Sequence, residues 1–140
     1  MRGFGVVDLA LLFLRALLAL VFVSHGAQKL VPGIGRSSPE HEARRFEKAG
    51  IRPAREMALL TGVLQLGAGV LVLLGFLTPL AALVLGTTMV VAALRAHDGR
   101  GFFIQNGGYE YNLALVVVSL ALILAGAGSY SLDAALGLFW

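Results

Sequence analysis

The sequence predicts an all-α integral membrane protein, a four-helix bundle with a short amphipathic helix in the first cytoplasmic loop. Composition is the first observation, because 58% of the 140 residues are hydrophobic and only 14% are charged. The second is a mean hydropathy of +0.84, which lies above the range of soluble domains. A chain this short cannot bury so much apolar surface in its own core, so lipid must solvate much of it. We expect one membrane domain over residues 1–140.

Long apolar segments are the third observation, and they predict four spans, at about residues 8–30, 55–75, 79–97 and 109–127. At about 1.5 Å per residue, such segments are long enough to cross a hydrocarbon core of roughly 30 Å. The second and third spans form one charge-free run, residues 57–94, which is too long for a single crossing. Thr78 as an N-cap and Pro79 at the first helical position divide this run.

The first segment has an alternative interpretation as a cleaved signal peptide, since Arg2 precedes it. Arg15 would interrupt the apolar core of such a peptide, and no clean cleavage site follows. We therefore expect a membrane span there.

Two shorter helical elements are also predicted. Ser38 fits an N-cap with Pro39 after it, residues 40–48 form an amphipathic helix, and Gly50 fits its end. We interpret this helix as solvated or lying among lipid headgroups. Near the C-terminus, residues 129–131 cap a short amphipathic turn.

Basic residues are distributed unevenly over this topology. Nine of the eleven Lys and Arg residues lie at or in the two longer loops, namely Lys29, Arg36, Arg44, Arg45, Lys48, Arg52, Arg55, Arg95 and Arg100. The positive-inside rule predicts that both loops are cytoplasmic and both termini are not.

Polar side chains concentrate at the same ends of the spans. They form a candidate ligand-binding set: His25, Gln28, Lys29, Arg95, His97, Gln105, Asn106, Glu110 and Tyr111. A cleft lined by amide, imidazole, ammonium and aromatic groups suits a quinone-like head group or another small ligand with a polar head and an apolar body.

Residues 101–111 allow two interpretations. Asn106 and the two glycines after it form a strong turn signal, and the neighbouring aromatic residues suit a membrane interface. Alternatively, Gln105 and Asn106 dip back between the helices. Non-helical backbone at membrane depth is tolerated where other parts of the protein bury it or where it lines a cavity.

Arg15 is an expected intramembrane charge, together with Asp8. At about 100° per residue, Asp8, Arg15, Gly26 and Lys29 share one helical face. Arg15 should therefore face the interior and find a carboxylate, either Asp8 or Glu110, or backbone carbonyls. Such a pair would be either purely structural or functional. Gln65 also needs an interhelical hydrogen bond.

The cysteine and histidine content limits the cofactors that this chain can hold. The chain has no cysteine, which excludes disulfides, iron–sulfur clusters and thiol relays within it. A haem held by two histidines would need His25 and His97 at matched depth, which we do not favour. No histidine pair has the spacing of metal ligands along one helix, so no metal site is predicted. The residues identify no catalytic group.

Several motifs are familiar as a set. Arg15 is followed by residues 24–29 (SHGAQK), 46–51 (FEKAGI), 75–80 (GFLTPL) and 105–112 (QNGGYEYN). Together they resemble the DoxX family, small four-helix proteins of the bacterial inner membrane. The resemblance implies an association with membrane oxidoreductase systems, including a thiosulfate:quinone oxidoreductase and oxidative-stress defence. Relatives often carry glutamate where this chain has Gln65, which argues against a proton-coupled role here.

The sequence leaves three functions open. It does not decide whether the chain is an enzyme. The first is a subunit or accessory of a quinone-linked or oxidative-stress redox system with a polar ligand cleft near the cytoplasmic face. The second is a structural or assembly partner that docks another protein through the basic loop. A small-molecule transporter is the third, disfavoured without an inverted repeat unless the protein oligomerises. The expected partners are the lipid bilayer and a soluble or membrane oxidoreductase. Oligomerisation is left open, and no nucleic acid is expected.

Overall fold

The computed structural model describes residues 5–95 and 99–139. This part of the chain is helical and contains no β-strand. Its elements follow in the order α1 (Val6–Leu30), η1 (Ile34–Arg36), α2 (Pro39–Lys48), α3 (Ala54–Leu74), α4 (Thr78–Arg95), η2 (Ile104–Asn106), α5 (Glu110–Ala125) and α6 (Leu132–Leu136).

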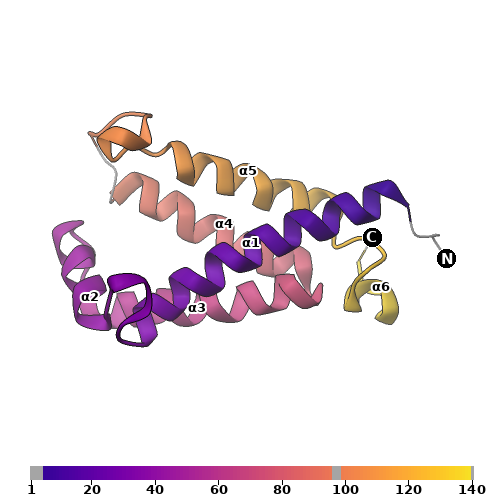
Figure 1. Cartoon of the computed structure of the whole chain (residues 1–140), viewed down its shortest axis with the longest axis horizontal. Coiled ribbons are helices and arrows are strands. Elements are labelled where there is room, and N and C mark those ends of the chain that lie inside the picture. The colour runs from indigo at the N-terminus through magenta and orange to yellow at the C-terminus, as the bar shows by residue number, and fades with distance from the viewer. Residues whose placement is uncertain (1–4, 96–98, 140) are drawn as a thin grey trace.

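The long helices are arranged in two pairs. Helix α1 packs along α3, helix α4 packs along α5, and α3 joins the pairs through α4. Figure 1 shows that α2 lies at one end of the elongated molecule and α6 at the other. We call these the α2 end and the α6 end. Contacts between α1 and α5 are few, so the two pairs leave room between them.

Each long helix buries one stripe of residues spaced by three or four positions. In α1 this stripe contains Asp8, Arg15, Gly26 and Lys29, the residues that the helical spacing places on one face. The core combines residues of all four long helices, among them Leu18, Phe22, Val72, Leu85 and Leu122. Leucine, valine and phenylalanine side chains also cover the outer faces, for example Phe13, Leu20, Leu83, Leu94 and Leu124. Lipid is the solvent that suits such a surface.

Three helices are long and apolar enough to cross a membrane: α1, α3 and α4. Helix α5 is apolar but has only 16 residues, about 24 Å at the usual rise. The four predicted spans thus correspond to three helices of sufficient length and one shorter helix. The prediction extended the fourth span to residue 127, but the helix ends at Ala125 because Gly126 leaves the helical conformation.

Glycines bring α1 and α3 into close approach near the α2 end. A Cβ atom on Gly26 would lie 2.6 Å from the backbone nitrogen of Leu66 and 2.8 Å from the carbonyl oxygen of Gly62. On the facing side, a Cβ on Gly62 would lie 2.8 Å from the Cβ of Lys29. Small residues of this kind allow membrane helices to pack backbone to backbone.

Arg15 ties the α6 end together. The residue is 1% exposed. Its guanidinium donates to four carbonyl oxygens: Val72 at 2.9 Å, Leu73 at 2.7 Å, Ala127 at 3.2 Å and Tyr130 at 2.7 Å. Two of these belong to the last turn of α3, where the helix dipole is negative. Of the partners considered for Arg15, backbone carbonyls are therefore the observed acceptors.

The two carboxylates proposed as partners are engaged elsewhere. Asp8 accepts the N–H groups of Gly5 at 3.0 Å and Ser129 at 2.9 Å. Glu110 accepts the N–H of Ile104 at 3.1 Å, at the α2 end.

Helix α4 begins differently from the prediction. Thr78 is the first helical residue, and its buried hydroxyl oxygen has no hydrogen-bond partner. The N-terminal N–H groups of Leu77 and Thr78 donate instead to the carboxylate of Asp133, at 2.7 and 2.9 Å. The expected Thr78 cap is wrong because a carboxylate from a distant segment, favoured by the helix dipole, occupies the capping position.

Candidate functional site

A cavity of about 710 Å³ lies at the α2 end, between the two helix pairs. All the long helices contribute to its wall, together with α2 and the loop before α5. Its apolar lining includes Phe46, Ile51, Leu64, Met89 and Ile104. Its polar lining includes His25, Lys29, Glu42, Gln65, Thr88, Tyr111 and Asn112. This combination of apolar walls with a few polar groups is typical of small-molecule sites.

Helix α2 forms one side of the cavity because it folds onto α3. Ser38 caps the helix by accepting the N–H of His41 at 3.1 Å, and Pro39 occupies the first helical position, both as predicted. Most of α2 is exposed or half-buried, as expected of a solvated or headgroup-level surface helix, but one side chain differs. Glu42 is 2% exposed, since the face of α2 that carries it packs against the long helices.

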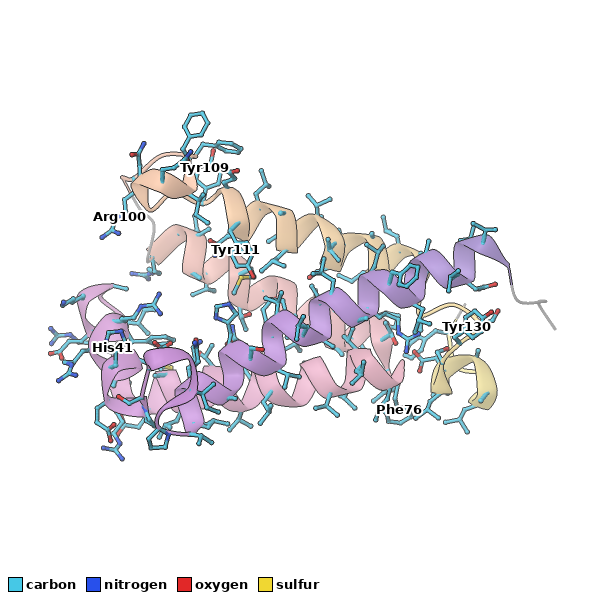
Figure 2. All side chains as sticks on the ribbon, viewed as in Figure 1. His41, Phe76, Arg100, Tyr109, Tyr111 and Tyr130 are labelled. Carbon is cyan, nitrogen blue, oxygen red and sulfur yellow. The ribbon has the colours of Figure 1, made fainter. Side chains whose placement is uncertain are left out.

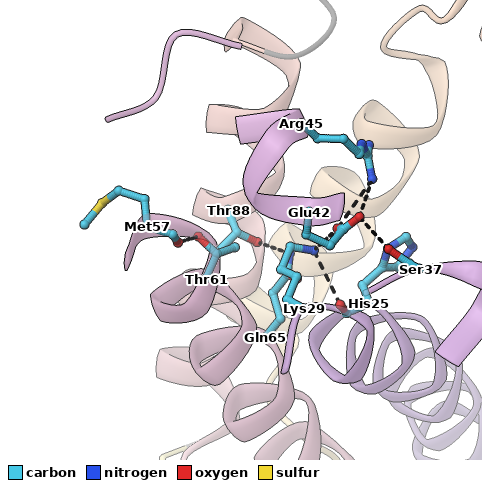
Figure 3. Close-up of polar contacts among 9 residues, drawn as sticks. All are labelled: His25, Lys29, Ser37, Glu42, Arg45, Met57, Thr61, Gln65 and Thr88. Carbon is cyan, nitrogen blue, oxygen red and sulfur yellow. Dashed lines mark hydrogen bonds and ion pairs between the residues drawn. The ribbon is translucent and has the colours of Figure 1, made fainter. Parts of the chain in front are cut away.

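A buried ion pair fastens α2 to α1, as Figure 3 shows. The ammonium of Lys29 lies 3.5 Å from one carboxylate oxygen of Glu42. The other oxygen accepts the hydroxyl of Ser37 at 3.0 Å and the guanidinium of Arg45 at 3.1 Å. Lys29 also donates to the carbonyl oxygen of His25 at 3.4 Å. Ionised Glu42 thus has several donors, which a buried carboxylate requires.

The protonation of Glu42 is set by opposing effects. Burial is the largest and raises the pKa of the carboxyl, while Lys29, Arg45 and the Ser37 hydroxyl lower it. Together these partners outweigh burial, so the pKa of Glu42 lies below its ordinary value. The carboxylate is accordingly ionised at neutral pH.

His25 and Tyr111 face each other across the cavity. Their ring centroids are 6.4 Å apart with an interplanar angle of 44°, and Figure 2 shows Tyr111 projecting from α5 toward the interior. The two rings form a contact between α1 and α5, which make few contacts in all. Both rings offer a flat face and a polar atom, which is useful for binding a planar ligand.

Gln65 on α3 and Thr88 on α4 form a polar contact between these two helices. The amide nitrogen of Gln65 donates to the hydroxyl oxygen of Thr88 at 3.3 Å, and that hydroxyl donates to the carbonyl oxygen of Leu85 at 2.8 Å. The carbonyl oxygen of Gln65 is buried and has no hydrogen-bond partner.

Charge in the cavity lining is strongly one-sided. The described lining residues include five Lys or Arg side chains and one carboxylate, Glu42. Four of the cations, Arg45, Lys48, Arg95 and Arg100, are exposed, so the entrance carries positive potential. Such a field favours ligands with negative charge or electron-rich oxygen atoms.

Four of the nine predicted ligand-binding residues line this cavity: His25, Lys29, Arg95 and Tyr111. Gln28 packs against the backbone of Gly35 in the first loop. Gln105 and Asn106 are exposed, and Glu110 binds the loop backbone. These four therefore lie outside the cavity lining, and His97 lies outside the described residues.

The loop before α5 explains why its amides miss the cavity. Its backbone closes on itself through Tyr109 N–H to Gly101 at 3.1 Å and Glu110 N–H to Phe102 at 2.8 Å. A Cβ on Gly108 would lie 2.5 Å from the oxygen of Gly101, so glycine is required. Of the two interpretations of this stretch, the geometry is that of a turn. Gln105 and Asn106 do not enter between the helices.

The polar lining residues that were missed as binding candidates include Glu42, Arg45, Gln65, Thr88 and Asn112. Glu42 and Arg45 belong to a charged helix that sequence alone assigns to the solvent. Gln65, Thr88 and Asn112 carried a usable signal, because polar side chains within apolar spans usually face protein or a cavity. No group of three or more His, Cys, Asp or Glu side chains is arranged to hold a metal within residues 5–95 and 99–139.

One family model and two uncharacterised proteins match the chain. The DoxX family model matches residues 10–98. An uncharacterised membrane protein of Mycobacterium tuberculosis is 35% identical over 136 residues, covering 86% of this chain and 77% of that protein. An uncharacterised protein of Haemophilus influenzae is 31% identical, covering 88% of this chain and 87% of its own length. No solved structure matches the chain.

Proposed function

The chain belongs to the DoxX family of membrane proteins, and we propose that it is a subunit or accessory of a membrane redox system that binds a quinone-class ligand at its α2 end. The cavity there carries this proposal. Its volume of about 710 Å³ lies within the roughly 300–1,000 Å³ that is usual for ligand pockets.

The cavity lining matches the chemistry of a quinone. A quinone head is a flat ring with oxygen atoms at opposite edges, attached to an apolar tail. Lys29, His25 and Tyr111 offer polar hydrogens and ring faces to such a head, while Leu64, Met89 and Ile104 offer apolar contact. The positive entrance supports binding of reduced forms that carry negative charge. Residues of this chain bind and orient the ligand, and a partner oxidoreductase exchanges electrons with it.

The membrane arrangement belongs to the same proposal. We propose a four-helix bundle with four crossings in the bacterial inner membrane, the loops that carry α2 and η2 in the cytoplasm, and both termini on the other side. The excess of Lys and Arg in those loops supports this orientation. Helix α5 falls short of roughly 30 Å, and local thinning of the bilayer accommodates such a mismatch at modest cost.

A direct experiment measures both the resident ligand and its binding. Protein purified in mild detergent is extracted and analysed for quinones by mass spectrometry, and affinity for a decylbenzoquinone probe is measured by equilibrium dialysis. We expect co-purified quinone and saturable binding. His25→Ala should weaken binding about three- to tenfold, the usual effect of removing one hydrogen-bonding contact.

The matched control is His41→Ala, because His41 is exposed on α2 and lies at the outer edge of the molecule (Figure 2). This variant should bind the probe like the wild type. Absence of both extracted quinone and saturable binding in the wild-type protein would overturn the proposal.

The partner oxidoreductase is expected to dock on α2. This helix exposes Arg44, Arg45 and Lys48, of which Arg44 lies outside the cavity lining. Charge reversal at Arg44 should release a cross-linked partner while the decylbenzoquinone affinity stays unchanged. Recovery of the chain without any cross-linked partner would remove this part of the proposal.

A further inference from the structure

Three exposed cations at the entrance of the cavity have no carboxylate partner. Lys48 comes from α2, Arg95 from the end of α4 and Arg100 from the segment before η2, and all three belong to the cavity lining. No ion pair joins them to a carboxylate within residues 5–95 and 99–139. Cations of one sign around a cleft raise the local concentration of anions.

Arg100 lies against the wall of the cavity. Its Nη1 atom is 2.9 Å from the position that a Cβ on Gly107 would take, and Gly107 also lines the cavity. The guanidinium thus rests on the loop before α5 instead of extending away from the protein. Figure 2 shows Arg100 at the same end of the molecule as His41 of α2.

A second, apolar groove adjoins the cavity on the outer side of α3 and α4. It has a volume of about 300 Å³, and all of its lining residues are Val, Leu, Gly or Ala. Leu64 lines both the cavity and the groove. Val63 and Leu80 on the groove walls are 57% and 54% exposed, so the groove is open to the lipid around the bundle.

The cavity and the groove form one continuous path along α4. Lining residues follow from Val84 in the groove through Thr87 and Val91 to Arg95 at the entrance. This path is about 17 Å long at the usual helical rise. One leaflet of a bilayer is roughly 20 Å thick, half of the 40–45 Å total. A single phospholipid is therefore long enough to occupy both ends of the path.

Gly67 leaves space in the middle of the groove. A Cβ atom on this residue would meet no atom within 4 Å, although Gly67 belongs to the groove lining. A hydrocarbon chain can lie in this space without displacing a side chain of the protein.

From these features we infer that the α2 end binds an anionic phospholipid. Its phosphate lies among Lys48, Arg95 and Arg100, and one acyl chain follows the groove between α3 and α4. Basic pockets between membrane helices are known to bind anionic lipid headgroups, and the apolar groove selects a lipid over a free phosphate. The inference goes beyond the proposed function and does not depend on it, because it uses the entrance cations and the outer groove in place of His25 and Tyr111.

The test measures lipid binding to delipidated protein in detergent by native mass spectrometry, without added quinone. The probes are palmitoyl-oleoyl phosphatidylglycerol, which is anionic, and palmitoyl-oleoyl phosphatidylcholine, which is zwitterionic. We expect the anionic lipid to bind at least about tenfold more tightly, since each basic residue near an anionic headgroup contributes a factor of about five.

The entrance cations are tested by Arg95→Gln and Arg100→Gln, both at exposed positions. Each variant should weaken phosphatidylglycerol binding about fivefold and leave phosphatidylcholine binding nearly unchanged. Arg55→Gln is the matched control. It removes an exposed cation at the start of α3 that lines neither the cavity nor the groove, and it should bind both lipids like the wild type.

The groove is tested by Gly67→Leu, which fills it with a side chain. This variant should weaken palmitoyl-oleoyl phosphatidylglycerol binding about fivefold, the effect of leaving about one or two methylene groups unburied. Binding of dihexanoyl phosphatidylglycerol, whose chains are too short to reach the groove, should not change. Val70→Leu adds apolar bulk at an exposed site of α3 outside the groove and should bind like the wild type.

Four results would overturn the inference. They are equal affinity for the two long-chain lipids, wild-type affinity in both arginine variants, wild-type affinity in folded Gly67→Leu, and binding of inorganic phosphate as tight as that of phosphatidylglycerol. The last result would identify a site for a soluble anion. Thermal unfolding checks that each variant is folded, and if Gly67→Leu is not, the exposed arginine variants decide the outcome.

Discussion

The carboxylate of Asp133 accepts the backbone N–H of Thr78 at 2.9 Å, although 55 residues separate the two in the sequence. A second hydrogen bond joins the same carboxylate to Leu77 at 2.7 Å. Helix α4 is thus capped by a side chain from α6. At the same end, Arg15 binds the carbonyl oxygens of Ala127 and Tyr130. The C-terminal segment therefore closes the α6 end, and the cavity opens at the opposite end.

Removing the Asp133 carboxylate should destabilise the protein. Asp133→Ala leaves two buried N–H groups at the start of α4 without acceptors, and we expect a loss of about 1–3 kcal/mol in the free energy of unfolding. Asp133→Asn retains one acceptor and should lose less. Unfolding in mixed detergent micelles measures both. The exposed neighbour Leu136 gives a control, Leu136→Ala. Wild-type stability in Asp133→Ala would contradict the capping role.

Thr78 should tolerate loss of its hydroxyl. A true N-cap threonine costs about 1 kcal/mol when its oxygen is removed. Here the hydroxyl oxygen has no partner, so the nearly isosteric Thr78→Val should change the free energy of unfolding by less than about 0.5 kcal/mol. The measurement is the same detergent unfolding. A loss as large as that of Asp133→Ala would show that the hydroxyl is the cap after all.

Arg15 should be required for the docking of the C-terminal segment. Arg15→Met leaves four carbonyl oxygens without their donor, and we expect a loss on the order of 3 kcal/mol. Hydrogen exchange should increase over residues 126–136. Arg15→Lys keeps the charge but has a different donor geometry. Its free energy of unfolding should lie between those of the wild type and Arg15→Met. Unchanged exchange in Arg15→Met would rule out this role.

Docking of α2 should depend on pH through Glu42. The pKa of this carboxyl is lowered in the folded protein, so its ionised form contributes stability above the ordinary pKa of about 4.3. That contribution is lost as pH falls through the lower folded-state pKa. We therefore expect constant hydrogen-exchange protection of α2 from about pH 8 to 5 and a decrease below about pH 4.

Glu42→Gln should show weakened α2 protection already at neutral pH, because it removes the charge that binds Lys29 and Arg45. Glu47→Gln is the matched control, since Glu47 is exposed on the same helix. Equal protection of α2 in both variants at pH 7 would mean that the buried ion pair does not hold the helix.

The sequence by itself determined the helices and the solvent around them. Apolar runs, Ser38 with Pro39, and the glycines that end helices act within one or two turns, so local rules suffice to predict them. The buried stripe of α1 was also predictable, because Asp8, Arg15 and Lys29 follow the helical repeat. His25, Lys29, Arg95 and Tyr111 could be chosen as candidates because polar residues at the ends of apolar segments are unusual.

Only the tertiary structure decided which of these groups meet. The Asp133 cap, the carbonyl cage around Arg15 and the burial of Glu42 each join segments far apart in the chain. Their formation depends on how whole helices pack, which local spacing does not encode. Gln65 illustrates the difference most clearly. Its sequence context predicts that it needs an interhelical hydrogen bond, but only the packing of α3 against α4 identifies the Thr88 hydroxyl as the partner of its amide nitrogen.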